Sequence, residues 1–191
     1  MDTQSHLKSL FPAPGRLQNE WVTLRMLEAG DFESLYEAAS DPLIWEQHPN
    51  PDRYKRDVFT TYFEGAIQSR RAYLVNETKT GRVIGCTRYY DFQPEKASVC
   101  IGYTFVVRAC WGKPYNRSMK TLMLDAAFER VNEVCFHIGA ENIRSQKAIA
   151  KLGARKSGEI EMSYYGELPR LNFIYSILKE EWHAFSNQTQ P

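Results

Sequence analysis

Residues 98–132 read SVCIGYTFVVRACWGKPYNRSMKTLMLDAAFERVN. From Ser98 to Val107, apolar side chains alternate with smaller or polar ones, which is the pattern of a half-buried strand. From Arg117 to about Asn132, apolar side chains recur at helical spacing and cover a wide face. Between them lies WGKPYN, residues 111–116, whose glycine and proline are typical of a turn. The stretch therefore predicts a strand, a turn and a helix in direct succession.

The same two periodicities place the remaining elements around this unit. Helical spacing predicts a helix from Asp31 to Ala39, one around 59–66 and one at 142–152, and alternation predicts strands at 20–27, 72–77, 82–90, 133–138, 159–165 and 171–178. The order β-αα-βββ-α-β-α-ββ predicts one α+β domain with a mixed central sheet of about seven strands flanked by helices. We expect residues 1–19 to be a flexible arm, 20–183 the domain and 184–191 a polar tail.

The composition excludes several classes of protein. The chain has 191 residues, the length of one ordinary domain, and its 43% hydrophobic and 25% charged residues exclude intrinsic disorder. Lys and Arg number 24 against 23 Asp and Glu, so the net charge of +1 argues against a nucleic-acid or membrane-surface partner. Four cysteines without a C-x-x-C pair, together with four scattered histidines, predict no metal site. With no signal peptide and no apolar run of about 18 residues, we expect a cytoplasmic protein.

Positive charge is concentrated in two stretches. Residues 108–120 and 142–157 together hold nine Lys and Arg residues and no Asp or Glu, and both include the start of a predicted helix. Exposed amides at a helix N-terminus with cations beside them suit a phosphate or pyrophosphate. The alternative is that the two stretches are ordinary solvated helix faces.

The WGKPYN turn, its flanking strand and helix, and the segment Asn142-x-x-Ser145-x-x-Ala148-x-x-Lys151-Leu152-Gly153 resemble the GNAT superfamily of acyl-CoA-dependent N-acetyltransferases. Within it, the chain is most similar to the branch of the ribosomal-protein N-terminal acetyltransferases. The resemblance covers roughly residues 21–178. It implies that the strands ending near Val107 and His137 are splayed apart and form a cleft for acetyl-CoA, the cosubstrate.

The resemblance also implies which residues contact acetyl-CoA. Backbone groups of Phe105 and Val107 would bond the pantetheine amides, and a backbone amide near Val107 would stabilise the oxyanion. Amides of the turn would wrap the pyrophosphate, Asn142 would bond the pantetheine, and two lysines of the last helix would approach the adenosine phosphates. The implied cofactor-binding residues are Phe105, Val107, Gly112, Lys113, Tyr115, Asn116, Arg117, Asn142, Lys147 and Lys151.

The chain departs from the family pattern in two places. The family turn usually runs Arg/Gln-x-x-Gly-x-Gly/Ala, but here Trp111 holds the first place, and Pro114 and Asn116 hold the glycine places. Pro114 has no N–H to give to a pyrophosphate, while Asn116 suits a helix N-cap. Many members also carry a Tyr seven residues after the Asn, as the acid that protonates the CoA thiolate. This chain has Ile149 there, and Ser145 is the hydroxyl left nearby, either as that acid or as a plain first-turn residue.

His137 is the candidate general base. Val134, Phe136 and Ile138 share one face of its strand, so His137 lies on the other face, beside the implied cleft. An imidazole with a pKa near 6.5 can take a proton from an ammonium at neutral pH. The alternative is a half-buried strand histidine that hydrogen-bonds to its neighbours.

The acceptor side is less clearly marked. Trp45 lies in a proline-flanked loop with Glu46 and His48, and further candidates lie near the bend between the last two strands. The predicted acceptor-binding residues are Trp45, Glu161, Tyr164 and Tyr165.

The sequence thus predicts transfer of an acetyl group from acetyl-CoA to a primary amine, by direct attack in a ternary complex. The alternative is a non-catalytic acyl-CoA-binding module, which the atypical turn and Ile149 favour. A nucleic-acid binder fits poorly, because the basic stretches lack interleaved exposed aromatic residues. The acceptor remains open between a protein N-terminus, an amino acid, a polyamine and an antibiotic, and a homodimer remains open as well.

Overall fold

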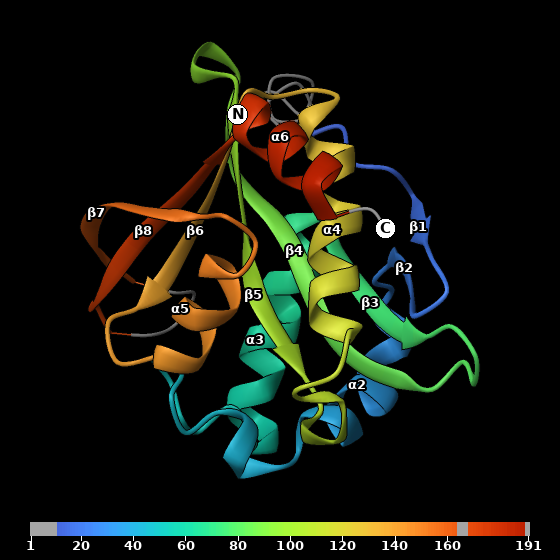
Figure 1. Cartoon of the computed structure of the whole chain (residues 1–191). Coiled ribbons are helices and arrows are strands. Elements are labelled where there is room, and N and C mark those ends of the chain that lie inside the picture. The colour runs from blue at the N-terminus through green and yellow to red at the C-terminus, as the bar shows by residue number, and fades with distance from the viewer. Residues whose placement is uncertain (1–10, 164–167, 190–191) are drawn as a thin grey trace, which may run out of the picture.

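An eight-stranded mixed sheet forms the centre of the computed structural model, which describes residues 11–163 and 168–189 (Figure 1). Its spatial order is β1-β2-β3-β4-β5-β6-β8-β7, and each neighbouring pair is antiparallel except β5 and β6. The strands are β1 (Arg16–Gln18), β2 (Val22–Met26), β3 (Ala72–Glu77), β4 (Val83–Gln93), β5 (Ser98–Val106), β6 (Glu133–Gly139), β7 (Arg155–Met162) and β8 (Arg170–Leu178).

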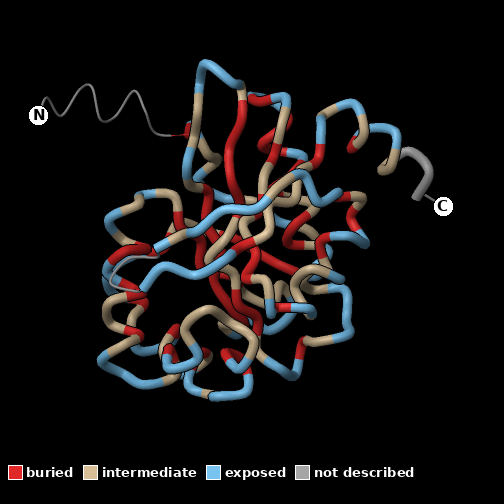
Figure 2. The backbone as a smooth tube through the Cα atoms, turned by 90° about the vertical axis from the view of Figure 1, so that its left-hand side faces the viewer, coloured by how far each residue is buried: buried red, intermediate tan, exposed pale blue. Residues whose placement is uncertain are grey.

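Helices cover both faces of the sheet, which we call the α3 face and the α4 face. Helices α2 and α3 pack on the first, α4 and α6 on the second, and each face has its own hydrophobic core (Figure 1). Figure 2 shows the buried backbone following the central strands, with exposed residues around them. The α+β prediction is confirmed. The helices are α2 (Phe32–Ala39), α3 (Arg56–Ser69), α4 (Tyr115–Phe128), α5 (Ile143–Ala150) and α6 (Lys179–Thr189).

The sheet has one strand more than the sequence predicts, because the chain joins it before residue 20. Strand β1 pairs with β2, and Phe11 is 2% exposed, with its ring centroid 4.6 Å from that of Tyr89. The expected flexible arm therefore contains part of the sheet and of the core. One buried phenylalanine among prolines has no periodicity from which its burial could be predicted.

The carboxyl-terminal elements also extend further than expected. Strand β7 begins at Arg155, and its side chains are mostly exposed, as on an edge strand, so its alternation is weak. Residues 184–189, expected as part of a polar tail, continue α6. No helix among residues 11–163 and 168–189 is long and apolar enough to cross a membrane.

The parallel pair at the centre of the sheet separates after three residues. Ser98–Cys100 pair with Glu133–Cys135, and beyond them β5 and β6 diverge (Figure 1). In the diverging part, the register between β4 and β5 shifts, and Tyr103 has a φ of 50°. The Tyr62 hydroxyl donates to the Tyr103 carbonyl at 2.5 Å, which holds this bulge from α3. The predicted splayed strands are present, and an irregularity of β5 lies directly beside the gap.

Candidate active site

A cavity of about 260 Å³ lies in the gap between β5 and β6. Its walls come from both strands, the turn after β5, α4, α5 and the segment that joins α2 to α3. The cavity therefore lies between the part of the sheet that ends with β5 and the part that begins with β6. Its basic lining side chains are His48, Arg53, Lys113, Lys120, His137 and Arg144.

The turn after β5 brings backbone amides to one end of the cavity. Gly112 has a φ of 71°, which glycine accepts without strain, and Gly112 and Lys113 both line the cavity. Helix α4 follows with Pro114 as its N-cap residue and no side-chain cap, so its first N–H groups are left for a ligand. Asn116 lines the cavity from the first turn of α4 and is not the N-cap. This end of the cavity has the donors that a pyrophosphate needs.

The side chains of Tyr115 and Arg117 lie outside the cavity. The Tyr115 hydroxyl donates to Glu77, and the Arg117 guanidinium is exposed, 6.0 Å from the ring centroid of Phe185. Only the backbone N–H groups of Tyr115 and Arg117 are placed for the predicted role.

The peptide groups of β5 that face the gap are one residue away from those expected. The Val107 N–H donates to a carbonyl of β4 at 2.8 Å, and the Phe105 carbonyl also points toward β4. Because successive peptide groups of a strand point to opposite edges, the groups of Thr104 and Val106 point away from β4 and toward the gap, where the Val106 carbonyl accepts the Trp111 indole N–H at 2.8 Å. The bulge sets this alternation, and the sequence pattern gives no sign of it.

Asn142 precedes α5 and lines the cavity, as does Ser145. The Asn142 side chain is buried, and its Oδ1 accepts the Ser145 N–H at 3.1 Å, which caps the helix. Within the described residues this side chain makes no further hydrogen bond, so its NH₂ group remains for a ligand. Lys147 of α5 and Lys151, which caps the end of α5, are exposed and do not line the cavity.

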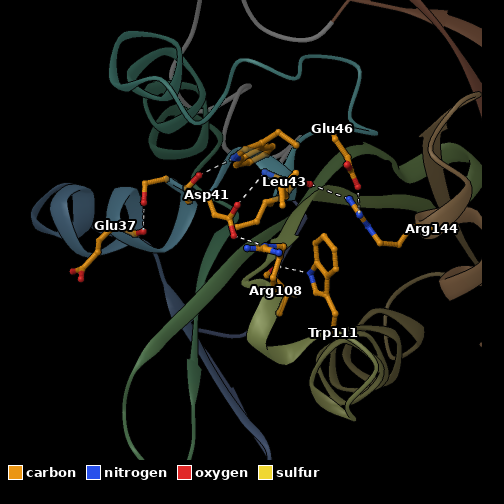
Figure 3. Close-up of polar contacts among 12 residues, drawn as sticks. Glu37, Asp41, Leu43, Glu46, Arg108, Trp111 and Arg144 are labelled. Carbon is orange, nitrogen blue, oxygen red and sulfur yellow. Dashed lines mark hydrogen bonds and ion pairs between the residues drawn. The ribbon is translucent and has the colours of Figure 1, made fainter.

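Arg144 links α5 to the segment between α2 and α3 (Figure 3). Its guanidinium pairs with Glu46 at 3.3 Å and stacks 3.9 Å from the ring centroid of Trp111. Arg108, in the turn after β5, forms a second ion pair with Asp41 of the same segment. These contacts fix the two walls of the cavity to each other. In the sequence, Arg144 is visible only as one member of a basic stretch.

His137 lines the cavity from the α3 face and is half-buried. Its Nδ1 lies 3.1 Å from the Tyr90 hydroxyl, and its Nε2 lies 3.8 Å from the Cys100 Sγ. Burial lowers the pKa of the imidazole, and the nearby charge of Asp91 opposes this more weakly. The ring is therefore neutral at neutral pH. It can accept a proton directly or through the Tyr90 hydroxyl.

The predicted acceptor contacts lie mostly away from the cavity. Trp45 is 1% exposed, and its indole N–H donates to a carbonyl of α2 at 2.7 Å, so it is a core residue. Glu161 is exposed on β7 and does not line the cavity. Tyr164 and Tyr165 lie outside the described residues.

His48 and Arg53, from the segment between α2 and α3, line the cavity instead. The Arg53 side chain is buried, with its guanidinium carbon 5.7 Å and 5.3 Å from the ring centroids of Trp45 and Tyr62. Burial, and then the charges of Arg53 and Arg144, lower the pKa of His48 and keep it neutral. His48 belongs to the loop that the sequence singles out, whereas Arg53 is one of three cations in the polar segment 51–57 and gives no such signal.

Lys120 is buried in the wall of the cavity on α4, at 3% exposure. Its Nζ lies 2.6 Å from the Thr104 Oγ1 and 3.3 Å from the Thr87 Oγ1. Burial lowers its pKa to about 7. The sequence does indicate that Lys120 is buried, because Lys120 falls one helical turn before Met123 and Leu124, inside the apolar face of the predicted helix.

A family model for the acetyltransferase (GNAT) domain matches residues 22–155. The chain belongs to the GNAT acetyltransferase family. GNAT acetyltransferases use acetyl-CoA as cosubstrate and transfer its acetyl group to an amine. The GNAT fold accounts for the splayed strands, and the observed residues fit the cosubstrate. Free amides at the start of α4 suit its pyrophosphate, and peptide groups of β5 and the Asn142 side chain suit an amide-rich arm in the gap.

Solved structures share this fold over most of the chain. A T. thermophilus protein assigned as an acetyltransferase is 26% identical, with a TM-score of 0.77, over 94% of this chain and 97% of its own. A Vibrio cholerae protein assigned as a ribosomal-protein-serine acetyltransferase is 17% identical, with a TM-score of 0.66 over 85% and 97%. A Vibrio cholerae spermidine N-acetyltransferase in complex with CoA and spermine is 18% identical, with a TM-score of 0.63 over 86% and 99%. The last two show a similar fold only, and no curated protein matches the chain significantly by sequence.

Proposed function

We propose that this GNAT protein acetylates a primary amine by direct attack of the amine on acetyl-CoA within a ternary complex. The continuity of the cavity carries the proposal, because one space reaches from the turn before α4, through the gap, to His48 and Arg53 on the α3 face. Cosubstrate and amine would enter from opposite sides and meet in a buried space that holds them in reacting geometry.

Among the described residues, the cavity offers no thiolate that could form a transient acetyl-enzyme, and acetylation of Lys120, whose pKa burial lowers, would give a stable amide that cannot pass the acetyl group on. Cys110 is the cysteine that lines the cavity, and burial raises the pKa of this thiol, which keeps it protonated. A neutral thiol is a poor nucleophile, so a covalent acetyl-enzyme is disfavoured. The route that remains is direct attack of the amine on the thioester of acetyl-CoA.

His137 is proposed as the general base. It lies on the α3 face, from which the amine would approach, and its lowered pKa keeps the imidazole neutral and able to take the ammonium proton. A backbone N–H of β5 facing the gap, such as that of Val106, would stabilise the oxyanion of the tetrahedral intermediate. Ser145 and Asn142 would hold the cosubstrate from α5.

The acceptor class is proposed more broadly, as a protein N-terminus or a small-molecule primary amine. The similarity to the ribosomal-protein N-terminal branch favours a protein N-terminus. Because the fold is shared with a spermidine acetyltransferase, small-molecule amines are tested as well. The protein should be incubated with acetyl-CoA and a panel of amines: peptides with free N-termini, the same peptides with blocked N-termini, free amino acids and polyamines. Release of free CoA thiol is measured.

Thiol release with free but not with blocked N-termini would identify a peptide acceptor, and release with polyamines a small-molecule acceptor. Acetyl-CoA binding with no thiol release above hydrolysis, for any amine, would contradict the proposal and favour a non-catalytic binding module. Pro114 and Ile149 are the observations that keep this second function in view, since neither supplies a proton where the family commonly has a donor.

A further inference from the structure

The reaction needs a proton donor at the leaving sulfur as well as a base for the amine. An alkyl thiol has a pKa of about 8.5, so the thiolate that leaves is a stronger base than water and is released more easily if it is protonated as it forms. Ile149 lines the cavity from α5 but carries no proton to give. The Ser145 hydroxyl of α5 also lines the cavity, but a serine hydroxyl is a weaker acid than an alkyl thiol, so a more acidic donor must come from another element.

We propose that Lys120 is the catalytic acid that protonates the CoA thiolate as it leaves, an inference that rests on the proposed function. Lys120 lines the cavity, is 3% exposed, and reaches the gap beside β5, where it donates to the hydroxyls of Thr104 and Thr87. An ammonium has three donors. Two are used in these contacts, which leaves one for a group in the cavity.

Lys120 and His137 line the same cavity from opposite faces of the sheet. Thr87, a partner of Lys120, also contacts the Met123 sulfur of α4 at 3.5 Å, which places this network on the α4 face. His137 contacts Tyr90, whose ring packs on Tyr103, and Tyr103 belongs to the core of the α3 face. The base and the acid are therefore separated by the gap itself, so the acid does not compete for the acceptor.

The charged state of Lys120 suits proton transfer in this direction. The groups that face it are the two threonine hydroxyls, the ring of Phe136 at 5.9 Å and the Cys86 thiol, which raises its pKa slightly against the larger effect of burial. With a pKa of about 7, Lys120 is a stronger acid than an alkyl thiol, so transfer to the thiolate is downhill. An ordinary lysine with a pKa near 10.4 would not give up its proton as readily.

The protons balance over one turnover. Two protons leave the acceptor nitrogen, the first to His137 before the C–N bond forms and the second after it. The C–S bond breaks, the thiolate takes a proton from the Lys120 Nζ, and Lys120 is left neutral. One acceptor proton returns to Lys120 through solvent, and the other is released to solvent, so each turnover yields one amide, one thiol and one proton.

Three variants test this role. Lys120→Met removes the proton and keeps most of the volume. Lys120→Arg keeps the positive charge and the donors but does not release a proton, because its pKa exceeds 12. Lys96→Met, an exposed lysine in the turn between β4 and β5, is the matched control. For each variant, kcat and KM are measured against pH, and the dissociation constant of acetyl-CoA is measured by calorimetry.

Lys120→Met and Lys120→Arg should lower kcat by about 10²-fold or more while the acetyl-CoA dissociation constant changes by less than about threefold. The kcat of the wild type should fall as the pH rises past the pKa of Lys120, and this limb should be missing in both variants. Lys96→Met should match the wild type.

The enzyme–CoA complex gives a readout that does not depend on turnover. A cation beside the sulfur lowers the pKa of the bound thiol, which is measured by titrating the ultraviolet absorbance of the thiolate. Lys120 itself is neutral at the pH where the thiol titrates, so the comparison is between Lys120→Arg, which stays charged, and Lys120→Met, which has no charge. The thiol pKa in the Lys120→Arg complex should be at least one unit lower than in the Lys120→Met complex, and in Lys96→Met it should equal that of the wild type. Equal thiol pKa values in Lys120→Arg and Lys120→Met, or full kcat in Lys120→Arg, would overturn the assignment and leave Lys120 as a structural partner of the threonines. If no amine is acetylated by the wild type, the proposed function fails, while this titration still decides the position of Lys120.

Discussion

Replacing Lys120 with Met should change how the stability of the fold depends on pH. The pKa of Lys120 is about 7 in the fold against an ordinary value of 10.5. Below pH 7 the side chain is charged in both the folded and the unfolded chain, and its buried charge destabilises the fold by about 5 kcal/mol, at about 1.4 kcal/mol for each pKa unit. Between pH 7 and 10.5 the unfolded chain binds a proton that the folded chain does not, so the free energy of unfolding rises by about 1.4 kcal/mol per pH unit.

Methionine has neither the charge nor the two hydrogen bonds to Thr104 and Thr87. The lost hydrogen bonds cost about 1 kcal/mol each at every pH. Lys120→Met should therefore be more stable than the wild type by about 3 kcal/mol at pH 6, and the difference should shrink with rising pH and vanish near pH 9.

The assay is urea unfolding, followed by circular dichroism, at one-unit steps from pH 6 to pH 9. The other titrating groups are common to both proteins and cancel in the difference, and Lys96→Met, on the surface, controls for the loss of a positive charge. A difference between Lys120→Met and the wild type that does not depend on pH would refute the reasoning, because it would mean that Lys120 titrates alike in the folded and unfolded chain.

Three further outcomes follow from the cavity. Acetyl-CoA at a hundredfold excess over its dissociation constant should stabilise the fold by about 2.7 kcal/mol, and an unchanged melting temperature would contradict binding at the turn before α4. Asn142→Ala should lose about 1 kcal/mol of stability with the helix cap and also bind acetyl-CoA more weakly, whereas lower stability with normal affinity would reduce Asn142 to a cap. His137→Ala should lower kcat by about 10²–10⁴-fold with acetyl-CoA affinity nearly intact. The wild-type rate should rise with pH through the His137 pKa, below 6.5, and a variant that keeps this limb and most of its kcat would exclude His137 as the base.

The sequence predicts the elements with strong periodicity and misses features that depend on contacts. Strand β5, the turn and α4 are evident from alternation, glycine and helical spacing, because each pattern is local. The burial of Phe11 and the pairing of β1 arise from contacts with distant strands, and no neighbouring residue reports them. Strand β7 is hard to place for the same reason, since its exposed charged side chains do not alternate.

The site shows the same division between local and long-range information. Gly112, Lys113, Asn116 and Asn142 all line the cavity, and their places follow from a turn and two helix starts, while their contact with acetyl-CoA stays a prediction. The backbone roles given to Phe105 and Val107 shift by one residue, since the bulge near Tyr103 forms against β4 and α3. Trp45 looks like an acceptor contact in its loop but is buried by packing against distant residues. Lys120 belongs to a basic stretch, and only its place on the apolar face of the helix indicates that it is buried.

The three-residue pairing of β5 with β6 also has a mechanical consequence. The backbone pairing divides the described sheet into two blocks, one from β1 to β5 and the other of β6, β8 and β7. The pairing of Ser98–Cys100 with β6 is what joins them. A tensile load across the sheet concentrates on that short seam, while each neighbouring antiparallel pair within a block shares the load along a longer ladder, apart from the short β1. A ligand with amide groups, bound in the gap, would add hydrogen bonds where β5 and β6 do not pair with each other. Rupture force measured across the two blocks therefore reports occupancy of the cavity, and without a ligand the weakest line between β2 and β7 is the β5–β6 seam that borders the cavity.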